Sequence, residues 1–587
     1  MVADQEFPTM SFGSGASMPS VRKQPFSILL MGQFGLGTPA IHGLLDRDVQ
    51  ALLADRQPNL QVQLPNLFQG QGNITAEITF GSLKDLRIER LAQCFAEIEL
   101  ACKLHGDLKK GLAREEVIRR NPEASSWPCV ADVVGKEAGN GENMSPADAP
   151  ENANTTRSEP GKFEDPLDNI LSMVADVGVV NTSPSSEGQP SQYGGEMDQV
   201  HRALNAFVGH ISRDFAPRDV GSWSKQALSG LEHVLAAQLS LLAEHPTLRM
   251  LRRNWLMVSF LLKRLGRSGD VRLHLLDSAD MSLAQAMRTL LLNRDDLMPE
   301  GLGVMIQLEV VDGPAVPSLL SQYAEIAELI QVPLVTSVGE EFLGINDGKL
   351  PETPIKEAYR HAWNELRGKP ESRWLGVTCN GFCLEDELRL SDVSMIAAAH
   401  GGMTISYPCR GSGAAIVAAI LAQCVEATGW PGDVMNTQYA VDGLVMPVDR
   451  KTPLLWPLGL GEVRALASSG VMAPGSTQLR DHLFLASAPS LAGQFSDGRD
   501  IGAGFVYQLL FRKAVSIIEA NYDQLFGLQG VYLCERLSQM MAMYSGDGQV
   551  HVAEMQADDG VKGVVIDITF GSSILRGGQI HLELPLA

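Results

Sequence analysis

The chain has 587 residues, with 47 Lys and Arg against 69 Asp and Glu, so its formal net charge is −22. A composition of 45% hydrophobic and 20% charged residues excludes a wholly disordered chain. At about 150 residues per domain, the length predicts three or four domains. The acidic balance argues against nucleic acid as a partner, because neutralising phosphates requires a basic stripe.

The N-terminal arm, residues 1–24, lacks the basic and apolar regions of a secretory signal. No apolar run reaches the eighteen or so residues of a membrane span, so direct membrane insertion is not expected. The eight cysteines are sparse and irregularly spaced. These features predict a cytoplasmic protein with reduced thiols.

Residues 25–112 are predicted to form a small α/β domain. Its expected elements are a strand at 26–31, a helix at 46–55, strands at 60–64 and 73–80, and a helix at 88–108. In the last helix, Leu91, Phe95, Ile98 and Cys102 fall at helical spacing on one face.

An acidic flexible linker is predicted at 113–196, because this segment is rich in Gly, Ser, Asn, Pro and acidic residues. Residues 121–200 hold fourteen acidic and three basic residues, which is half of the net charge. Within the linker, residues 164–176 are amphipathic, with apolar side chains at i, i+3, i+4 and i+7. This short helix is interpreted either as docked on the body of the protein or as a ligand for another protein.

Residues 197–587 are predicted to form a large α/β domain. Helices are expected around 200–215, 223–243 and 248–265. Strands at 271–276, 304–311, 333–337 and 375–379 then alternate with helices at 283–293, 317–331 and 362–366. Such alternation predicts a largely parallel sheet flanked by helices. Two long helices, 411–428 and 505–543, precede strands at 549–555, 561–570 and 579–584. The predicted fold class is α/β (α+β).

The C-terminal strands, residues 549–584, have few partners left in their own chain and are predicted to pair between subunits. Pairing only within the chain remains the alternative. The candidate inter-subunit residues are Val550, Val552, Val564, Ile566, Ile568, Phe570, Ile580, Leu582 and Leu584.

Three motifs suggest chemistry, but each lacks a required part. The loop Gly32–Thr38 follows a strand but has no lysine of a phosphate-binding loop. Cys379 and Cys383 have no second pair at zinc spacing, and Ser412 lacks the glycine spacing of a nucleophile elbow. No catalytic, cofactor-binding or metal-binding residue is therefore predicted, and a non-enzymatic assembly subunit is favoured.

Two stretches, read in order, resemble the two sheath proteins of the bacterial type VI secretion system, joined head to tail. Residues 25–108 resemble the small subunit, through the strand and loop Pro25–Phe34 and the segments 59–66 and 74–85. Gln33 stands where the family has Asp.

Residues 163–587 resemble the large subunit. The similar segments are His245-Pro246, Leu251–Trp255, 303–344, Trp363–Arg367, 371–376, Thr428–Trp430, Asp442–Pro447, 462–471 and the closing Leu584-Pro585. Asn380-Gly381 stands where the family has Pro-Arg.

The resemblance implies a contractile sheath of stacked hexameric rings that polymerises around an inner tube of an Hcp-like protein. It also implies a cytoplasmic location on a membrane-anchored baseplate, contraction that propels the tube and its effectors across a membrane, and recycling by a ClpV-like AAA+ unfoldase. The docking helix for that unfoldase would contain Leu167, Asp168, Ile170, Leu171 and Met173. The alternatives are the sheath of a phage-tail-like injection particle and an α/β enzyme that uses the sheet between residues 271 and 379.

Overall fold

The computed structural model describes residues 21–44, 49–112, 114–131, 220–266, 269–384, 388–389, 404–405, 409–446, 452–477, 480–492, 504–556, 562–575 and 578–585. Chain contacts divide it into two units. The described part of the first unit comprises residues of the ranges 21–64, 73–102 and 235–585, and that of the second comprises residues of the ranges 65–72 and 103–234.

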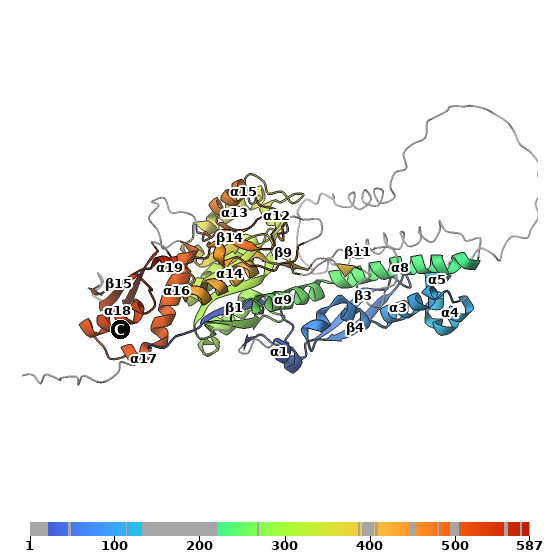
Figure 1. Cartoon of the computed structure of the whole chain (residues 1–587), viewed down its shortest axis with the longest axis horizontal. Helices are drawn as coiled ribbons and strands as arrows, with labels where there is room; N and C mark the ends of the chain where they lie inside the picture. Colours follow the sequence, from blue (N-terminus) through green and yellow to red (C-terminus); the bar gives the residue numbers. More distant parts are fainter. Residues whose placement is uncertain are drawn as a thin grey trace, which may run out of the picture. The chain divides into compact units, whose positions relative to one another are not determined.

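The first unit is built on an eight-stranded mixed sheet with the order β14-β13-β8-β7-β6-β1-β5-β2 (Figure 1). Its strands are β1 (Phe26–Gly32), β2 (Ala40–Gly43), β5 (Val271–Asp277), β6 (Leu302–Val311), β7 (Leu334–Val338), β8 (Leu375–Thr378), β13 (Val471–Ser476) and β14 (Leu483–Ser487). The six central strands are parallel, and β2 and β14 are antiparallel at the two edges. The predicted α/β fold with a parallel sheet is confirmed.

Strand β1 lies in the middle of this sheet, between β5 and β6 (Figure 1). Its register places Phe26 beside Val271 and Ile28 beside Val304. All seven of its residues are buried, as expected for an apolar strand that is covered on both faces. The segment 25–112, predicted to be a small domain of its own, therefore contributes its first strand to the sheet of the large domain.

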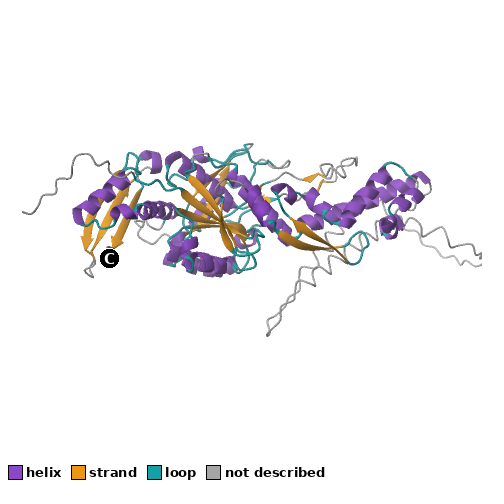
Figure 2. Cartoon of the chain, turned by 90° about the horizontal axis from the view of Figure 1, so that it is seen from below, coloured by secondary structure: helices purple, strands orange, loops and turns teal. Residues whose placement is uncertain are grey.

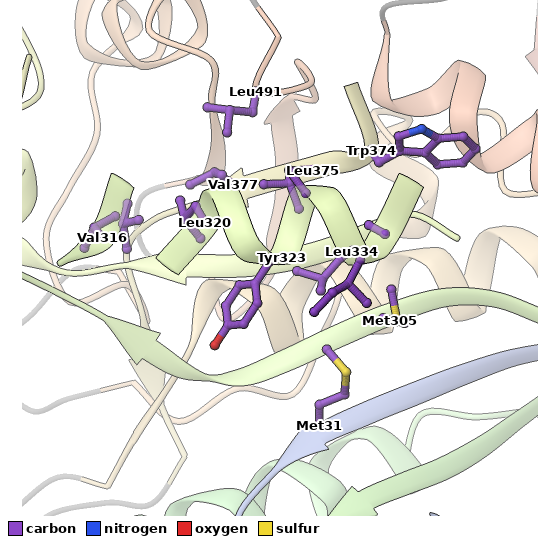
Figure 3. Packing of buried hydrophobic residues seen from close by; sticks show 14 of the residues in the cluster. Met31, Met305, Val316, Leu320, Tyr323, Leu334, Trp374, Leu375, Val377 and Leu491 are labelled. Atoms are coloured by element: carbon purple, nitrogen blue, oxygen red, sulfur yellow. The ribbon is translucent and has the colours of Figure 1, made fainter. Parts of the chain in front are cut away.

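Helices cover both faces of the sheet. Leu29 and Met31 of β1 belong to one buried cluster with side chains of α10 (Leu283–Met287), α11 (Val316–Ile330) and α13 (Glu357–Arg367), part of which Figure 3 shows. Ile28 and Leu30 alternate to the opposite face and are also fully buried. The helix α14 (Gly413–Thr428) contacts β5 to β8 and is buried over most of its length, which explains its nearly uniform small apolar sequence.

The remaining elements are short or flank the sheet. They are α1 (Val49–Arg56), β3 (Asn59–Pro65), β4 (Asn73–Thr79), α2 (Ile88–Gln93), α3 (Ala96–Lys109), α4 (Arg114–Arg120), α5 (Pro128–Ala131), α8 (Val220–Glu244), α9 (Pro246–Leu262), α12 (Glu340–Leu343), β9 (Phe382–Cys383), β10 (Leu388–Arg389), β11 (Thr404–Ile405), β12 (Arg410–Gly411) and α15 (Leu460–Ser468).

The chain ends in a C-terminal module of helices and a three-stranded antiparallel sheet, β15-β16-β17 (Figure 2). Its elements are α16 (Phe505–Ala520), α17 (Tyr522–Leu525), α18 (Gly530–Ala542), β15 (Gln549–Gln556), β16 (Lys562–Thr569), α19 (Ser572–Leu575) and β17 (Gln579–Pro585). A second buried cluster joins Leu510, Leu537 and Met541 of the helices to Ile566 and Leu582 of the sheet.

Two helices that the sequence predicts as continuous are interrupted. The predicted helix 88–108 is divided into α2, which ends at Gln93, and α3, which begins at Ala96, and Phe95 between them is fully buried. The predicted helix 505–543 is divided into α16, α17 and α18. Gly527 and Gly530 have φ of 81° and 60°, a left-handed conformation that ends a helix.

The second unit is helical and includes residues predicted as linker. Residues 114–131 contain α4 and α5, so described helices extend beyond the predicted start of the linker. Phe68 stacks on Trp127 with ring centroids 4.8 Å apart, and both side chains are buried. His105 Nε2 lies 3.0 Å from a carboxylate oxygen of Glu232, which is within ion-pair distance.

Candidate assembly interface

The C-terminal sheet is the part of the fold at which the sequence predicts subunit contacts. Its central strand, β16, is paired along its length with β15 on one side and β17 on the other. His551, Asp567 and His581 lie opposite one another across the three strands. The sheet therefore has two outer edges, one on β15 and one on β17.

The predicted inter-subunit side chains face the interior of this module. Six of the nine are buried, namely Val564, Ile566, Ile568, Phe570, Ile580 and Leu582. Val550, Val552 and Leu584 are half-buried and pack against the same cluster. These side chains are therefore engaged within their own chain, so a neighbouring strand would meet the main chain of an edge.

The edge of β17 is partly occupied by a tyrosine of α16. The hydroxyl of Tyr507 donates to the carbonyl of His581 at 3.0 Å and accepts from its N–H at 3.4 Å. The main chain of His581 thus points away from β16. Because main-chain direction alternates along an antiparallel strand, Gln579 and Glu583 also point outward, and Pro585 stands where no ladder N–H is needed.

The same alternation fixes the direction of the β15 main chain. The main-chain N–H and C=O groups of Asp567 point away from β17. They therefore form their hydrogen bonds with His551 on β15. The next residues on either side, Val550 and Val552, and likewise Glu554 and Gln556, then direct their N–H and C=O groups to the outer edge. In the part of the chain that the structure describes, no strand pairs with this edge.

The solvent face of the sheet carries a charged cluster. His581 Nδ1 lies 2.7 Å from an Asp567 oxygen, and His581 Nε2 lies 3.2 Å from a Glu583 oxygen. Hydrogen bonds to Asp567 first, and then to Glu583, raise the pKa of His581. The cluster is exposed, so it contributes charge to this face more than stability.

The segment before β1 is held against the C-terminal module by main-chain hydrogen bonds. Asn521, which is buried, accepts the N–H of Arg22 at 2.8 Å and donates to its carbonyl at 3.3 Å. The Tyr544 hydroxyl donates to the same carbonyl at 3.2 Å. Lys513 Nζ donates to the carbonyl of Gln24 at 3.0 Å. We call Val21–Pro25 the N-terminal strap.

Lys513 is a buried cation in this contact. Its Nζ also lies 5.9 Å from the centroid of the Phe26 ring. Burial, and secondarily the charge of Lys23, lower the pKa of Lys513 to about 8, while Asp270 opposes this shift. The neighbouring Arg512 instead pairs with both Glu519 oxygens at 3.0 Å and donates to the carbonyl of Leu302.

The carboxyl ends of β1 and β5, where α/β enzymes place ligands, are filled by side chains. Asp277 accepts the N–H groups of Phe34 and Leu36 at 3.0 and 2.7 Å, and Glu309 accepts that of Gln33. Phe34 packs against Trp255 with ring centroids 5.3 Å apart. Three main-chain donors of the glycine-rich loop are thus satisfied by the protein's own carboxylates, which opposes phosphate binding there.

The thiols and titratable clusters give no sign of a reactive centre. None of the eight cysteines, all of which lie in the described ranges, forms a disulfide. Burial raises the pKa of Cys379, and it raises those of Cys102 and Cys424 to about 11. Among the described residues, no group of three or more His, Cys, Asp or Glu could hold a metal ion. Within the same ranges no helix is both long and apolar enough to cross a membrane.

The predicted unfoldase-docking residues Leu167, Asp168, Ile170, Leu171 and Met173 lie outside the described residues, as does the predicted helix around 200–215. Sequence reasoning missed the strap contacts of Asn521, Lys513 and Tyr544, because nothing local marks a partner about 500 residues away. It also missed Val531 and Tyr532, which are exposed. Their signal was available, since neither falls on the apolar stripe formed by Leu533, Leu537 and Met540.

No family model and no curated protein matches the chain. Two of the similar solved structures are described as sheath proteins. One is the helical sheath of the anti-feeding prophage in its contracted state, with 12% identity over 54% of this chain and 74% of that chain and a TM-score of 0.30. Another is the sheath tail protein of Desulfitobacterium hafniense, with 10% identity over 52% of this chain and 61% of that chain and a TM-score of 0.30. At these TM-scores neither defines the fold of this chain.

Proposed function

We propose that the chain is a contractile-sheath subunit in which a small and a large sheath protein are joined. It would polymerise as stacked hexameric rings around an inner tube of an Hcp-like protein, on a membrane-anchored baseplate, and contract to drive the tube and its effectors across a membrane as in type VI secretion. The shared order of family-like segments from Pro25 to Pro585 supports this proposal.

The observation that carries the proposal is the outer edge of β15. An eight-residue antiparallel strand that ends a sheet presents alternate N–H and C=O groups to any strand that arrives. Strand addition supplies main-chain hydrogen bonds between copies without requiring a new apolar surface. Repeated from copy to copy, such a heterologous contact builds rings or helices.

The position of β1 supports the joining of two proteins. The strand is buried between β5 and β6, so the N-terminal segment and the large segment share one sheet. A connector between the N-terminal segment and the large segment therefore only has to bridge two parts of one folded sheet. The acidic residues within 132–200 would keep that connector solvated.

The enzyme alternative is less well supported. The crevice that it would use, at the carboxyl ends of β1 and β5, is filled by Phe34 and Trp255 and closed by the Asp277 hydrogen bonds. Work by a sheath requires no catalytic group, because it comes from the free-energy difference between extended and contracted lattices.

Glu554→Pro tests the strand-addition contact. The Glu554 N–H points to the outer edge, so a proline there removes an edge donor and leaves the bonds to β16 in place. We expect tubes to disappear from negative-stain micrographs of the purified protein. Thermal unfolding should stay within a few degrees of the parent, which shows that the module is folded.

Glu583→Pro, at the outer edge of β17, is the matched control, because Tyr507 already occupies that edge. Tubes from Glu583→Pro and none from Glu554→Pro support the proposal. The reverse result would move the contact to β17, and tubes from both variants would contradict strand addition. Deleting residues 577–587 is a poorer test, since it removes buried Ile580 and Leu582.

The unfoldase partner is proposed from the sequence alone. Replacing Leu167 and Ile170 by Asp should abolish binding to a ClpV-like AAA+ unfoldase in a pull-down and leave tube formation unchanged. Equal binding by parent and variant would refute the docking role of this helix, whereas no binding by the parent would favour a phage-tail-like particle, which needs no recycling.

A further inference from the structure

Large exposed apolar side chains are concentrated on α17 and α18. Of the nine such residues in the part of the chain that the structure describes, five lie between residues 522 and 543. Four of these form what we call the α17–α18 patch: Tyr522 (59% exposed), Phe526 (76%), Val531 (76%) and Tyr532 (71%). The rings of Tyr522 and Phe526 are in contact, with centroids 6.1 Å apart.

The patch is not required by the core beneath it. Leu525, Leu533 and Leu537 of the same helices already fill the cluster against the sheet. Burying a large apolar side chain such as Phe or Val is favourable relative to leaving it in water. A covering segment would therefore gain several such contributions, and clustered exposure of this kind marks an interaction surface.

The N-terminal strap brings a specific segment to this patch. Asn521 fixes both main-chain groups of Arg22, and Asn521 directly precedes Tyr522. Val21 packs against the apolar cluster of the same module. Arg22 also pairs with Asp523 of α17 at 3.5 Å. The twenty residues that precede Val21 in the sequence therefore emerge beside α17.

The composition of that segment suits an apolar surface. Residues 1–20 read MVADQEFPTMSFGSGASMPS and include Phe7, Met10 and Phe12, followed by Gly13 and Gly15, which permit a reversal of chain direction. Nine residues, from Phe12 to Ser20, can span at most about 30 Å. That reach is ample for a patch formed by two short consecutive helices.

We propose that residues 7–12 cover the α17–α18 patch of their own chain. A short tether gives an effective concentration of about a millimolar, which favours the segment of the same chain over that of a second copy at ordinary protein concentrations. The arm thus shields this surface in the unassembled subunit. The inference does not depend on the sheath proposal, because it concerns the single chain.

Site-specific photo-crosslinking of the full chain tests this contact. With Phe12→p-benzoylphenylalanine, irradiation at submicromolar concentration should give a product at monomer mass whose crosslinked peptide contains residues 522–532. The double variant F526S/Y532S should reduce this product at least tenfold. L329S/L460S, two exposed leucines elsewhere in the first unit, is the matched control and should leave it unchanged.

A chain that begins at Val21 provides a second readout, since it keeps the strap and removes the arm. We expect it to bind the apolar dye anilinonaphthalene sulfonate with at least twofold more fluorescence than the full chain, and F526S/Y532S should remove this difference. A crosslink at dimer mass would overturn the proposal in favour of a second copy. Crosslinks only outside 522–532, or equal dye binding, would overturn it altogether.

Discussion

Asp277 caps the loop after β1 by holding the N–H of Leu36 at 2.7 Å with one carboxylate oxygen, while the other accepts the N–H of Phe34. Asp277 is fully buried, so these bonds are not replaced by water. Asp277→Asn puts an amide donor where an acceptor is needed. We expect a loss of about 1–3 kcal/mol in the free energy of unfolding, measured by urea titration.

Asp280→Asn, an exposed position nearby, serves as the control for Asp277→Asn and should change stability by less than about 0.5 kcal/mol. If the two variants are equally stable, the loop is not held by the Asp277 carboxylate.

Lys513→Met should flatten the pH dependence of stability in alkaline solution. In the folded chain the pKa of Lys513 is lowered from 10.5 to about 8, so between these values the unfolded chain binds more protons. The free energy of unfolding therefore rises with pH in this window, by about 3 kcal/mol at most. Urea titrations at pH 7.5, 9 and 10 should show a smaller rise for the variant.

The exposed Lys349→Met is the control for Lys513→Met and should retain the slope of the parent. Because cysteines and tyrosines also titrate in this range, the informative quantity is the difference between parent and variant. If the free energies of unfolding of parent and Lys513→Met rise equally with pH, deprotonation of Lys513 is not the cause of the rise.

His581→Gln should reveal a pH-dependent contribution of opposite sign. The raised pKa of His581 means that its bonds to Asp567 and Glu583 stabilise the folded chain fully below about pH 6.5. That contribution is lost as the pH rises through the folded value. The melting temperature of the variant should therefore fall below that of the parent at pH 5.5 and approach it at pH 8.5.

Two other charged or polar groups accompany this cluster, His551 opposite Asp567 and the Tyr507 hydroxyl on His581. The exposed His361→Gln controls for the loss of a histidine elsewhere. A deficit of His581→Gln that is the same at both pH values would exclude titration of His581 as its cause.

Ile566→Ala separates the internal role of β16 from a role between subunits. Ile566 is fully buried in the cluster of the C-terminal module, so truncation should cost about 2–5 kcal/mol by leaving a cavity. A lower melting temperature of the unassembled protein would show this. An unchanged melting temperature together with lost tubes would indicate that the side chain contacts a neighbouring copy.

Much of the local structure could be predicted from the sequence, because apolar runs and periodicity are local signals. The continuous run of β1, the alternation of β4 and the three C-terminal strands are all found where they were predicted. The sequence pattern does not mark the breaks at Phe95 and Asn521, because Phe95 keeps the helical spacing of the apolar face and Asn521 bonds to Arg22, 499 residues away.

The same limit applies to the candidate interface. Sequence alternation identified the residues of β15 to β17 but not which face the helices cover, so side chains proposed for subunit contacts proved to be internal. The outward direction of the β17 main chain at His581 is shown by its bond to Tyr507, a contact that crosses 74 residues. Sequence periodicity carries no information about such a contact.

The central position of β1 also affects how the chain is made. Its seven buried residues leave the ribosome well before their partners, which begin at Val271 and Leu302. At about 5–20 residues per second, this apolar strand waits for roughly 12–50 seconds before either neighbour exists. Had the two segments been made as separate chains, that wait would end only with a diffusive encounter. Joined in one chain, β1 is already tethered to its place when the sheet forms.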